Sequence, residues 1–238
     1  MILRELDRRH PEPTLYPDEQ TGLACILSTW AEGACFMPAA ALTSIIGDAI
    51  PDELIADRIA FMKHDFGKVA SVRDLPLNRQ RMAVAMTMLA DILKDRRPFL
   101  LGRNLSAADL SAYHPLRFIR KNGGAEVEAM LPFGPLLEWM DRVAGAGHGN
   151  RHEYTAQSAL ATARTATPEP ASGVTDHDPS GLPAGAQVMV GTEQASDPIR
   201  GILVGTTPDR ITLRHQHDQA GTVHVHFPRH GYSLVAVD

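Results

Sequence analysis

Histidines near the end of the chain are the residues whose type and spacing could hold a metal ion. His215 and His217 form one His-x-His pair, and His224 and His226 form another. Alternation along a strand places His224 and His226 on one face, and a hairpin could bring the two pairs together around Zn²⁺ or Ni²⁺. The competing interpretation is a polar, solvated strand face. Because no cysteine and no acidic ligand is fixed beside these histidines, the sequence predicts no metal site.

The two cysteines form neither a metal-binding nor a nucleophilic pattern. Cys25 and Cys35 are the only cysteines of the chain, and they lie ten residues apart within a predicted helix. This spacing matches no metal motif and does not put the two thiols on one helix face. We therefore expect reduced thiols that pack in the core.

A serine and an aspartate three residues apart carry the most specific local signal. Ser106 stands at a predicted helix start, and Asp109 at the third helical position can accept the Ser106 N–H, which is a capping box. Leu105 before the cap and Leu110 after it can close a hydrophobic staple. Such a cap stabilises a helix by roughly 0.5–2 kcal/mol. An acidic side chain that accepts a backbone N–H at a helix start already has a structural role. We therefore interpret Ser106 and Asp109 as folding residues, not catalytic ones.

Length and composition narrow the class of protein. The chain has 238 residues, of which 44% are hydrophobic and only 5% aromatic, a balance that suits closely packed helices. A net charge of −5 argues against nucleic acid as a partner. No apolar run approaches the length of a membrane span, and the first residues lack the apolar region of a secretory signal. A cytoplasmic protein is expected.

Helical periodicity governs the first two thirds of the chain, which must position any site there. Predicted helices cover 1–9, 18–47, 50–66, 77–96, 106–121, 125–131, 132–144 and 153–164. We expect Pro38 to kink or break the second helix, because an interior proline removes a backbone hydrogen bond. Asn122, Gly123 and Gly124 should end the capped helix.

The pattern changes after residue 165. Residues 166–185 are rich in Pro, Gly, Asp and Ser and lack periodicity, which indicates a linker. Five short runs with a period of two follow, at 187–190, 199–204, 210–215, 222–227 and 232–237. The fold class predicted is a mainly α helical bundle with a small all-β, SH3-like barrel at 186–238.

Several segments resemble the glutathione transferase family. The run FLLGRNLSAAD at 99–109 resembles the start of the central buried helix in the C-terminal domain of that family. ILRELDRRHPEPTLYP at 2–17 resembles the end of the thioredoxin-like half and its linker, and PLLEWMDRVAG at 135–145 resembles a later helix. The resemblance extends to about residue 167, so 18–165 would be the helical domain and 1–17 a remnant of the thioredoxin-like domain.

The resemblance implies that glutathione contacts and catalytic residues lie in the thioredoxin-like half, which this sequence does not contain. The family's Glu-Ser pair, which binds glutathione, would fall just before Met1, so we assign no catalytic residue here. The helical half would supply the wall for a small hydrophobic electrophile. Its candidate residues are Trp30, Phe36, Met37, Tyr113 and Leu116.

Two functions remain open at this point. In the first, a glutathione-dependent enzyme conjugates or reduces electrophiles as a homodimer, with glutathione as co-substrate when the other half is present. In the second, the chain is a non-catalytic binding or scaffold module with the β segment as an adaptor. The apolar stripes at helical spacing fit ordinary core packing as well as a site, and the identity of the substrate is not predicted.

Overall fold

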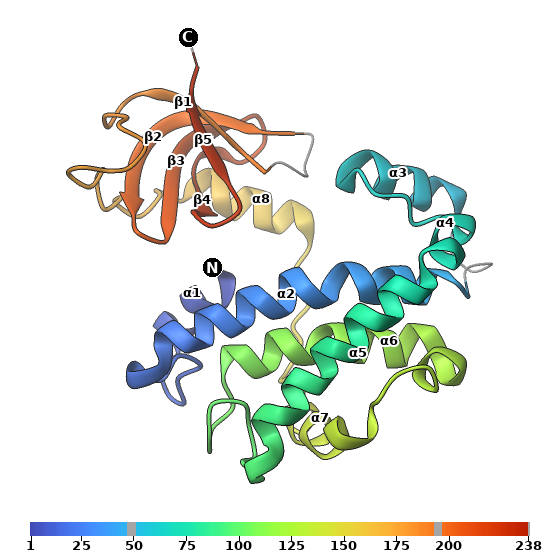
Figure 1. Ribbon diagram of the computed structural model, residues 1–238. Helices are drawn as coiled ribbons and strands as arrows, with labels where there is room; N and C mark the ends of the chain where they lie inside the picture. Colours follow the sequence, from blue (N-terminus) through green and yellow to red (C-terminus); the bar gives the residue numbers. More distant parts are fainter. Residues whose placement is uncertain (47–50, 193–196, 238) are drawn as a thin grey trace. The chain divides into compact units, whose positions relative to one another are not determined.

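The computed structural model describes residues 1–46, 51–192 and 197–237, and they divide into two compact units (Figure 1). The helical unit comprises 2–59 and 64–148, and the second unit comprises Met1, 60–63 and the C-terminal part from Gly149. The boundaries predicted near 47 and 50 lie outside the described residues. Residues 2–17 belong to the helical unit, and the Leu15 carbonyl accepts the Ala107 N–H at 2.9 Å.

Three helices build the core of the helical unit. The long helix α2 (Thr21–Ser44) packs against α6 (Ala107–Glu128) and, less extensively, against α5 (Leu75–Ile92). Shorter elements complete the unit: α1 (Ile2–Arg9), α4 (Lys68–Arg73), α7 (Leu137–Ala144) and the 3-10 turns η1 (Asp18–Gln20), η2 (Leu93–Asp95) and η3 (Gly134–Leu136). Helix α3 (Asp52–Met62) belongs to this unit as far as Ile59. The predicted helical first part is thereby confirmed.

Helix α2 packs through small residues. Ala24, Ala31, Cys35 and Ala39 are all buried on its inner face, and small side chains allow a close approach of neighbouring backbones. Pro38 lies inside the helix, which continues through it to Ser44, so the predicted break is wrong.

The span Asp18–Ser44 is long and apolar enough to cross a membrane by length and composition alone. Core helices of soluble proteins pass the same test. The buried residues of α2 belong to the same core cluster as those of α5 and α6. Only 28% of the apolar window is buried, and Leu23, Ile26 and Phe36 are exposed, so packing inside the unit accounts for part of the apolar composition.

The predicted end of the capped helix at 122–124 is a kink inside α6. Gly124 has φ 63° and ψ −172°, a backbone conformation that is not helical and that favours glycine. A Cβ atom at Gly123 would lie 2.9 Å from the Cβ of Val127, so the chain also needs glycine there for a close approach. One helical turn then resumes before Ala129 ends the element.

The second unit contains a five-stranded antiparallel sheet among its described residues. Its strands are β1 (Gln187–Gly191), β2 (Ile199–Thr207), β3 (Arg210–His217), β4 (Gly221–Pro228) and β5 (Ser233–Ala236), in the spatial order β4-β3-β2-β1-β5. The five predicted strands are confirmed, but the SH3-like barrel is not. Strands β4 and β5 lie at opposite edges of the sheet, and within the described residues β5 pairs with β1 alone, over four residues. The sheet is therefore open.

The segment predicted as a linker packs partly onto this sheet. Gly173 forms a parallel bridge with Gly205 of β2, and the Thr175 hydroxyl donates to the Thr206 carbonyl at 2.6 Å. Val174 and Leu182 pack against the core of the sheet. The helix α8 (Ala156–Thr165) contacts β4 within the same unit.

Candidate functional site

Asp109 is the centre of a fully buried polar cluster. Its Oδ2 accepts the Ser106 N–H at 3.0 Å and the Ser106 hydroxyl at 2.6 Å, so the capping box is formed. Its Oδ1 accepts the Leu100 N–H at 2.8 Å and the Trp139 Nε1–H at 2.9 Å. Asp109 and Ser106 both have 0% exposure. Four donors therefore satisfy one carboxylate in a place that water does not reach.

This cluster joins three parts of the helical unit. Leu100 belongs to the loop before α6, and Trp139 belongs to α7. Leu105 and Leu110 pack partly buried against the core, in the positions of a staple. With α7 held against the start of α6, Tyr113 packs edge-on to the Trp139 ring at 6.4 Å between centroids. The role of Ser106 and Asp109 is thus to position other residues.

The predicted substrate-binding residues differ in exposure, and Tyr113 is the one among them that lines the hollow described below. On α2, Phe36 is exposed, Met37 is half-buried, and Trp30 is half-buried against the core. On α6, Leu116 has 0% exposure and belongs to the core cluster of the unit, and its part in substrate binding stays a prediction. Tyr113 is half-buried and lines a hollow.

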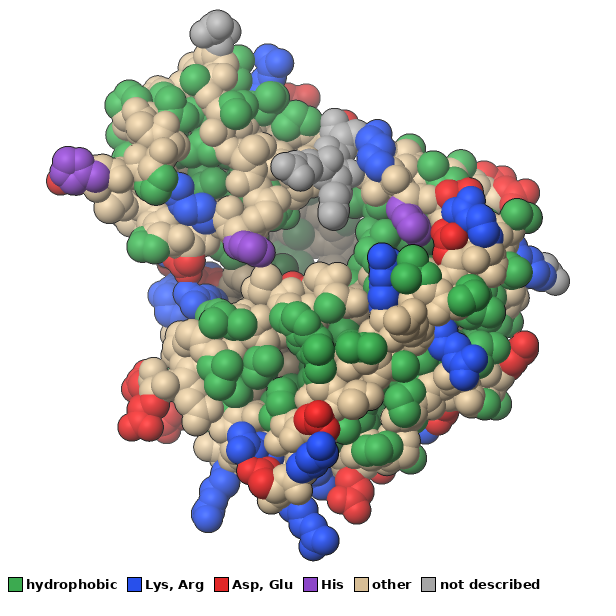
Figure 2. All heavy atoms as spheres, in the orientation of Figure 1, with side chains coloured by type: hydrophobic (Ala, Val, Ile, Leu, Met, Phe, Trp, Pro, Cys, Tyr) green, Lys and Arg blue, Asp and Glu red, His purple; other side chains and the backbone are tan. Residues whose placement is uncertain are grey.

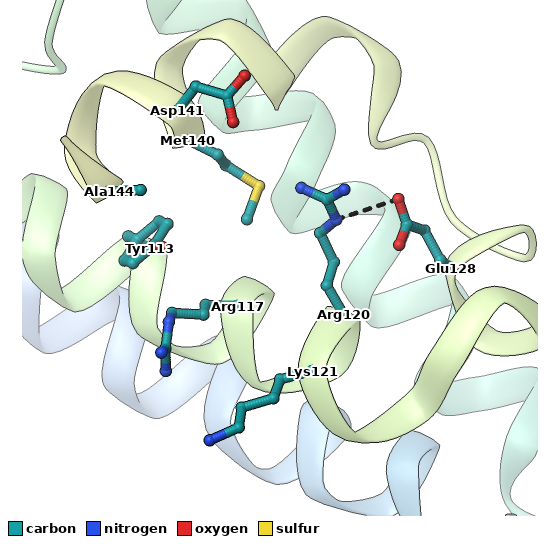
Figure 3. A pocket seen from close by; sticks show the side chains of 8 residues that line it. All are labelled: Tyr113, Arg117, Arg120, Lys121, Glu128, Met140, Asp141 and Ala144. Carbon is teal, nitrogen blue, oxygen red and sulfur yellow. Dashed lines mark hydrogen bonds and ion pairs between the residues drawn. The ribbon is translucent and has the colours of Figure 1, made fainter.

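This hollow of about 280 Å³ lies between α6 and α7 (Figure 3). Met140 on α7 is 3% exposed and points into the space between the two helices. The lining comprises Tyr113, Arg117, Arg120, Lys121 and Glu128 from α6 with Met140, Asp141 and Ala144 from α7. The hollow therefore combines an apolar floor with a charged rim.

The charges of the rim are not balanced. Arg120 donates to Glu128 at 3.0 Å and lies over the Phe133 ring at 5.9 Å, which fixes its guanidinium. Arg117 and Lys121 form no ion pair within the described part of the chain. Since Asp141 is the other carboxylate of the lining, the formal charge around the hollow is positive.

The cysteines do not form a reactive pair. Cys35 is buried, and burial raises the pKa of its thiol to about 11, which favours the unreactive protonated form. Cys25 is half-buried, and its sulfur accepts a hydrogen bond from Arg4 at 2.9 Å. Both cysteines are free. Cys35 belongs to the core cluster, as predicted, whereas Cys25 does not.

The two histidine pairs lie on opposite faces of the sheet. His215 and His217 pair with Val223 and Gly221, whereas His224 and His226 pair with Arg214 and Thr212. Directly paired residues share a face, and the face alternates along the strand. A hairpin does form between β3 and β4, but its register separates the two pairs instead of joining them around one ion.

The cationic rim of the hollow was not predicted from the sequence. Tyr113, Arg117, Arg120 and Lys121 recur at intervals of three and four, which places them on one side of a helix. That spacing was the available signal. Met140 and Ala144 of the apolar lining, however, lie on α7, and no sequence pattern predicts how α7 packs on α6.

Comparisons with known proteins find one kind of similarity. No protein-family model matches the chain, and no curated protein matches it. A solved structure does: a GST-like protein from Pseudomonas syringae, with a TM-score of 0.76 and 26% sequence identity, covering 100% of this chain and 76% of that one. The chain therefore has a fold like that of a glutathione-transferase-like protein.

Proposed function

We propose that this chain is a glutathione transferase family protein whose helical unit supplies the apolar wall for a small hydrophobic electrophile. The observation that carries the proposal is the likeness to a GST-like protein along the whole chain, joined to the buried Ser106–Asp109 capping box around which the helices pack. Trp30, Phe36 and Met37 on α2, with Tyr113 on α6, are the proposed contact residues. The proposal places the protein in the cytoplasm.

Glutathione enters as co-substrate, and its binding belongs to a thioredoxin-like half. Conjugation requires a group that stabilises the glutathione thiolate, usually near a helix N-terminus. We assign no such role to a described residue, because the buried thiol of Cys35 has a raised pKa and the Ser106 hydroxyl is bonded to Asp109. In this proposal the described residues shape electrophile specificity, and catalysis needs the other half.

Tryptophan fluorescence tests the apolar wall directly. Titration with 1-chloro-2,4-dinitrobenzene, an apolar electrophile, should quench the full chain saturably. Replacement of Trp30 by Phe should abolish the saturable part, while Trp139, which is 1% exposed, still emits. Quenching that rises linearly without saturation, or that is equal in the W30F variant, would contradict the wall.

Retention on glutathione-agarose tests whether the described residues themselves bind glutathione. If the described residues only bind electrophile, the chain should pass through the column and should show no conjugating activity. A chain that is retained by the column would contradict the scaffold alternative and would move glutathione binding into the residues described.

We also propose a homodimer that forms through α5. Leu77, Val84 and Met88 are 49–51% exposed on α5, and Figure 2 shows hydrophobic side chains at the surface of the helical unit. Exposed apolar side chains that gather on a helix favour association. Sedimentation equilibrium should give a dimer for the natural chain and a monomer for the V84E/M88E variant. A natural chain that is monomeric at micromolar concentration would overturn this part.

A further inference from the structure

We propose that the outer face of the β sheet binds an acidic polypeptide segment whose carboxylates alternate with apolar side chains. The outer face is the face opposite the hydrophobic core of the sheet, and it carries Met189, Arg200, Ile202, Arg210, Arg214 and His224. These residues belong to the second unit, whereas the residues of the proposed function belong to the helical unit. The two proposals can therefore fail independently.

The register of the strands determines which side chains share this face. The hydrophobic core of the sheet lies on the inner face, and alternation along each strand turns the next residue to the outer face. Arg214 on β3 is paired with Ile202 on β2 and with His224 on β4. Arg200 on β2 is paired with Met189 on β1. Because directly paired residues share a face, these side chains form one surface across four strands (Figure 1).

The positive charge of the outer face is not neutralised by the strands themselves. The five strands contain Arg200, Arg210 and Arg214 but no aspartate or glutamate. Arg200 and Arg214 are exposed, and Arg210 is half-buried. None of the three forms an ion pair within residues 1–46, 51–192 and 197–237. Diagonal neighbours on adjacent strands are within reach of long side chains, so Arg200 and Arg214 repel each other, and an acidic partner would relieve this repulsion.

The neighbours of the arginines indicate which kind of anion fits. Met189 and Ile202 are half-buried beside Arg200, and arginine and methionine are both enriched at protein–protein interfaces. A guanidinium also forms paired hydrogen bonds with a carboxylate. An acidic segment with apolar side chains can therefore satisfy the charges and cover the apolar positions together.

Nucleic acid fits this face less well. Proteins bind single strands by stacking the bases on aromatic side chains, and Phe227, the one Phe, Tyr or Trp residue of the five strands, packs in the core. The net charge of −5 over the whole chain also opposes a polyphosphate. We therefore commit to a polypeptide partner.

Fluorescence anisotropy with the full chain tests this surface. The probe is a fluorescein-labelled peptide of three Glu-Leu-Asp-Ser repeats, and the same peptide with Gln and Asn in place of the acids is the matched ligand control. The variant R200Q/R214Q removes two cations of the outer face, and R103Q/R151Q removes the same charge at exposed arginines outside the sheet. Affinity for the acidic peptide should fall about tenfold in R200Q/R214Q, the size expected from two exposed charge-assisted hydrogen bonds, and should be unchanged in R103Q/R151Q.

Three results would overturn the proposal: no binding of the acidic peptide, equal affinity for the amide peptide, or equal affinity in R200Q/R214Q and the natural chain. Tighter binding of labelled oligothymidylate than of the peptide would also overturn it and would assign the face to nucleic acid. A circular dichroism melt of R200Q/R214Q establishes that the variant is folded. The W30F variant, which tests the electrophile wall, should bind the acidic peptide as the natural chain does.

Discussion

At the scale of single residues, the Asp109 carboxylate connects three segments of the helical unit. Four donors from three segments converge on its two oxygens at 2.6–3.0 Å, all with the carboxylate fully buried. Removing an acceptor from such a cluster leaves buried donors without a partner, and each such donor costs roughly 1–3 kcal/mol. The cost is not additive over neighbouring groups.

We predict that Asp109→Ala destabilises the chain by at least about 3 kcal/mol in urea unfolding. The substitution Trp139→Phe removes one donor and should cost less, since Asp109 keeps its other three partners. Asp91→Asn is the control, because Asp91 is exposed in a pair with Lys94. Equal stability of D109A and D91N would contradict the proposed role of the cluster.

A second carboxylate organises the sheet unit. Burial of Asp178 raises its pKa, but hydrogen bonds from the Ser180 hydroxyl and N–H, then Thr206 and the charge of Arg229, outweigh burial and lower the pKa to about 2. The side chain of Asp178 is 5% exposed and forms an ion pair with Arg229. A pKa below the ordinary value means that the charged form stabilises the folded state.

This pKa gives a stability difference that depends on pH. The contribution of Asp178 is complete above about pH 4 and is lost as the pH falls through 2, because a lowered carboxyl pKa favours the folded state only while the group is ionised. We predict that the natural chain exceeds D178N in unfolding free energy by about 2 kcal/mol at pH 5. That difference should shrink toward pH 2. Asp176→Asn, at an exposed neighbour, is the control, and a constant difference for D178N between pH 5 and 2 would rule out the prediction.

At the scale of elements, local sequence signals predicted where the capped helix starts and where the strands lie. They did not predict whether the sheet closes into a barrel. The capping box depends on Ser106 and Asp109 alone, and the strands follow from alternation, so both could be identified from sequence. The continuation of α2 through Pro38 could not be identified from sequence, because packing of α2 in the core offsets the missing hydrogen bond. Nor could the open sheet, since closure depends on whether β5 pairs with a second strand.

The candidate site was likewise predictable only where it depends on local spacing. Spacing places Arg117 and Lys121 on one side of α6, but the hollow requires Met140 from α7, and its position depends on the Trp139–Asp109 hydrogen bond. The histidine pairs required the β3–β4 register, in which a shift by one residue exchanges the faces. Local sequence patterns contain neither kind of information.

Replacement of glycine by alanine should have opposite effects on stability at two positions of the helical unit. Gly124 has a positive φ at the kink of α6, and Ala there should destabilise by roughly 1–3 kcal/mol. Gly33 is exposed in α2 with no atom within 4 Å of a Cβ, so Ala should stabilise by roughly 0.5–1 kcal/mol. Urea unfolding followed by circular dichroism measures both, and a stabilising G124A would contradict the need for glycine at the kink.

At the scale of the whole molecule, the described chain has two hydrophobic cores that share no residue. The core of the helical unit is formed by buried residues between 24 and 143, whereas that of the sheet is formed by residues between 188 and 227. Each core has its own buried carboxylate, Asp109 or Asp178. Separate cores unfold as separate cooperative units when few interactions couple them.

Amide hydrogen exchange in the full chain can test this independence in both directions. We predict that D109A accelerates exchange in α2, α5 and α6 and leaves β1–β4 unchanged, because the lost hydrogen bonds lie in one core only. D178N at pH 5 should accelerate exchange in the strands and leave those helices unchanged. Stability effects at uncoupled sites add, so the double variant should show both accelerations at their single-variant sizes. If either single variant accelerated exchange in both sets of elements, the two cores would form one cooperative unit.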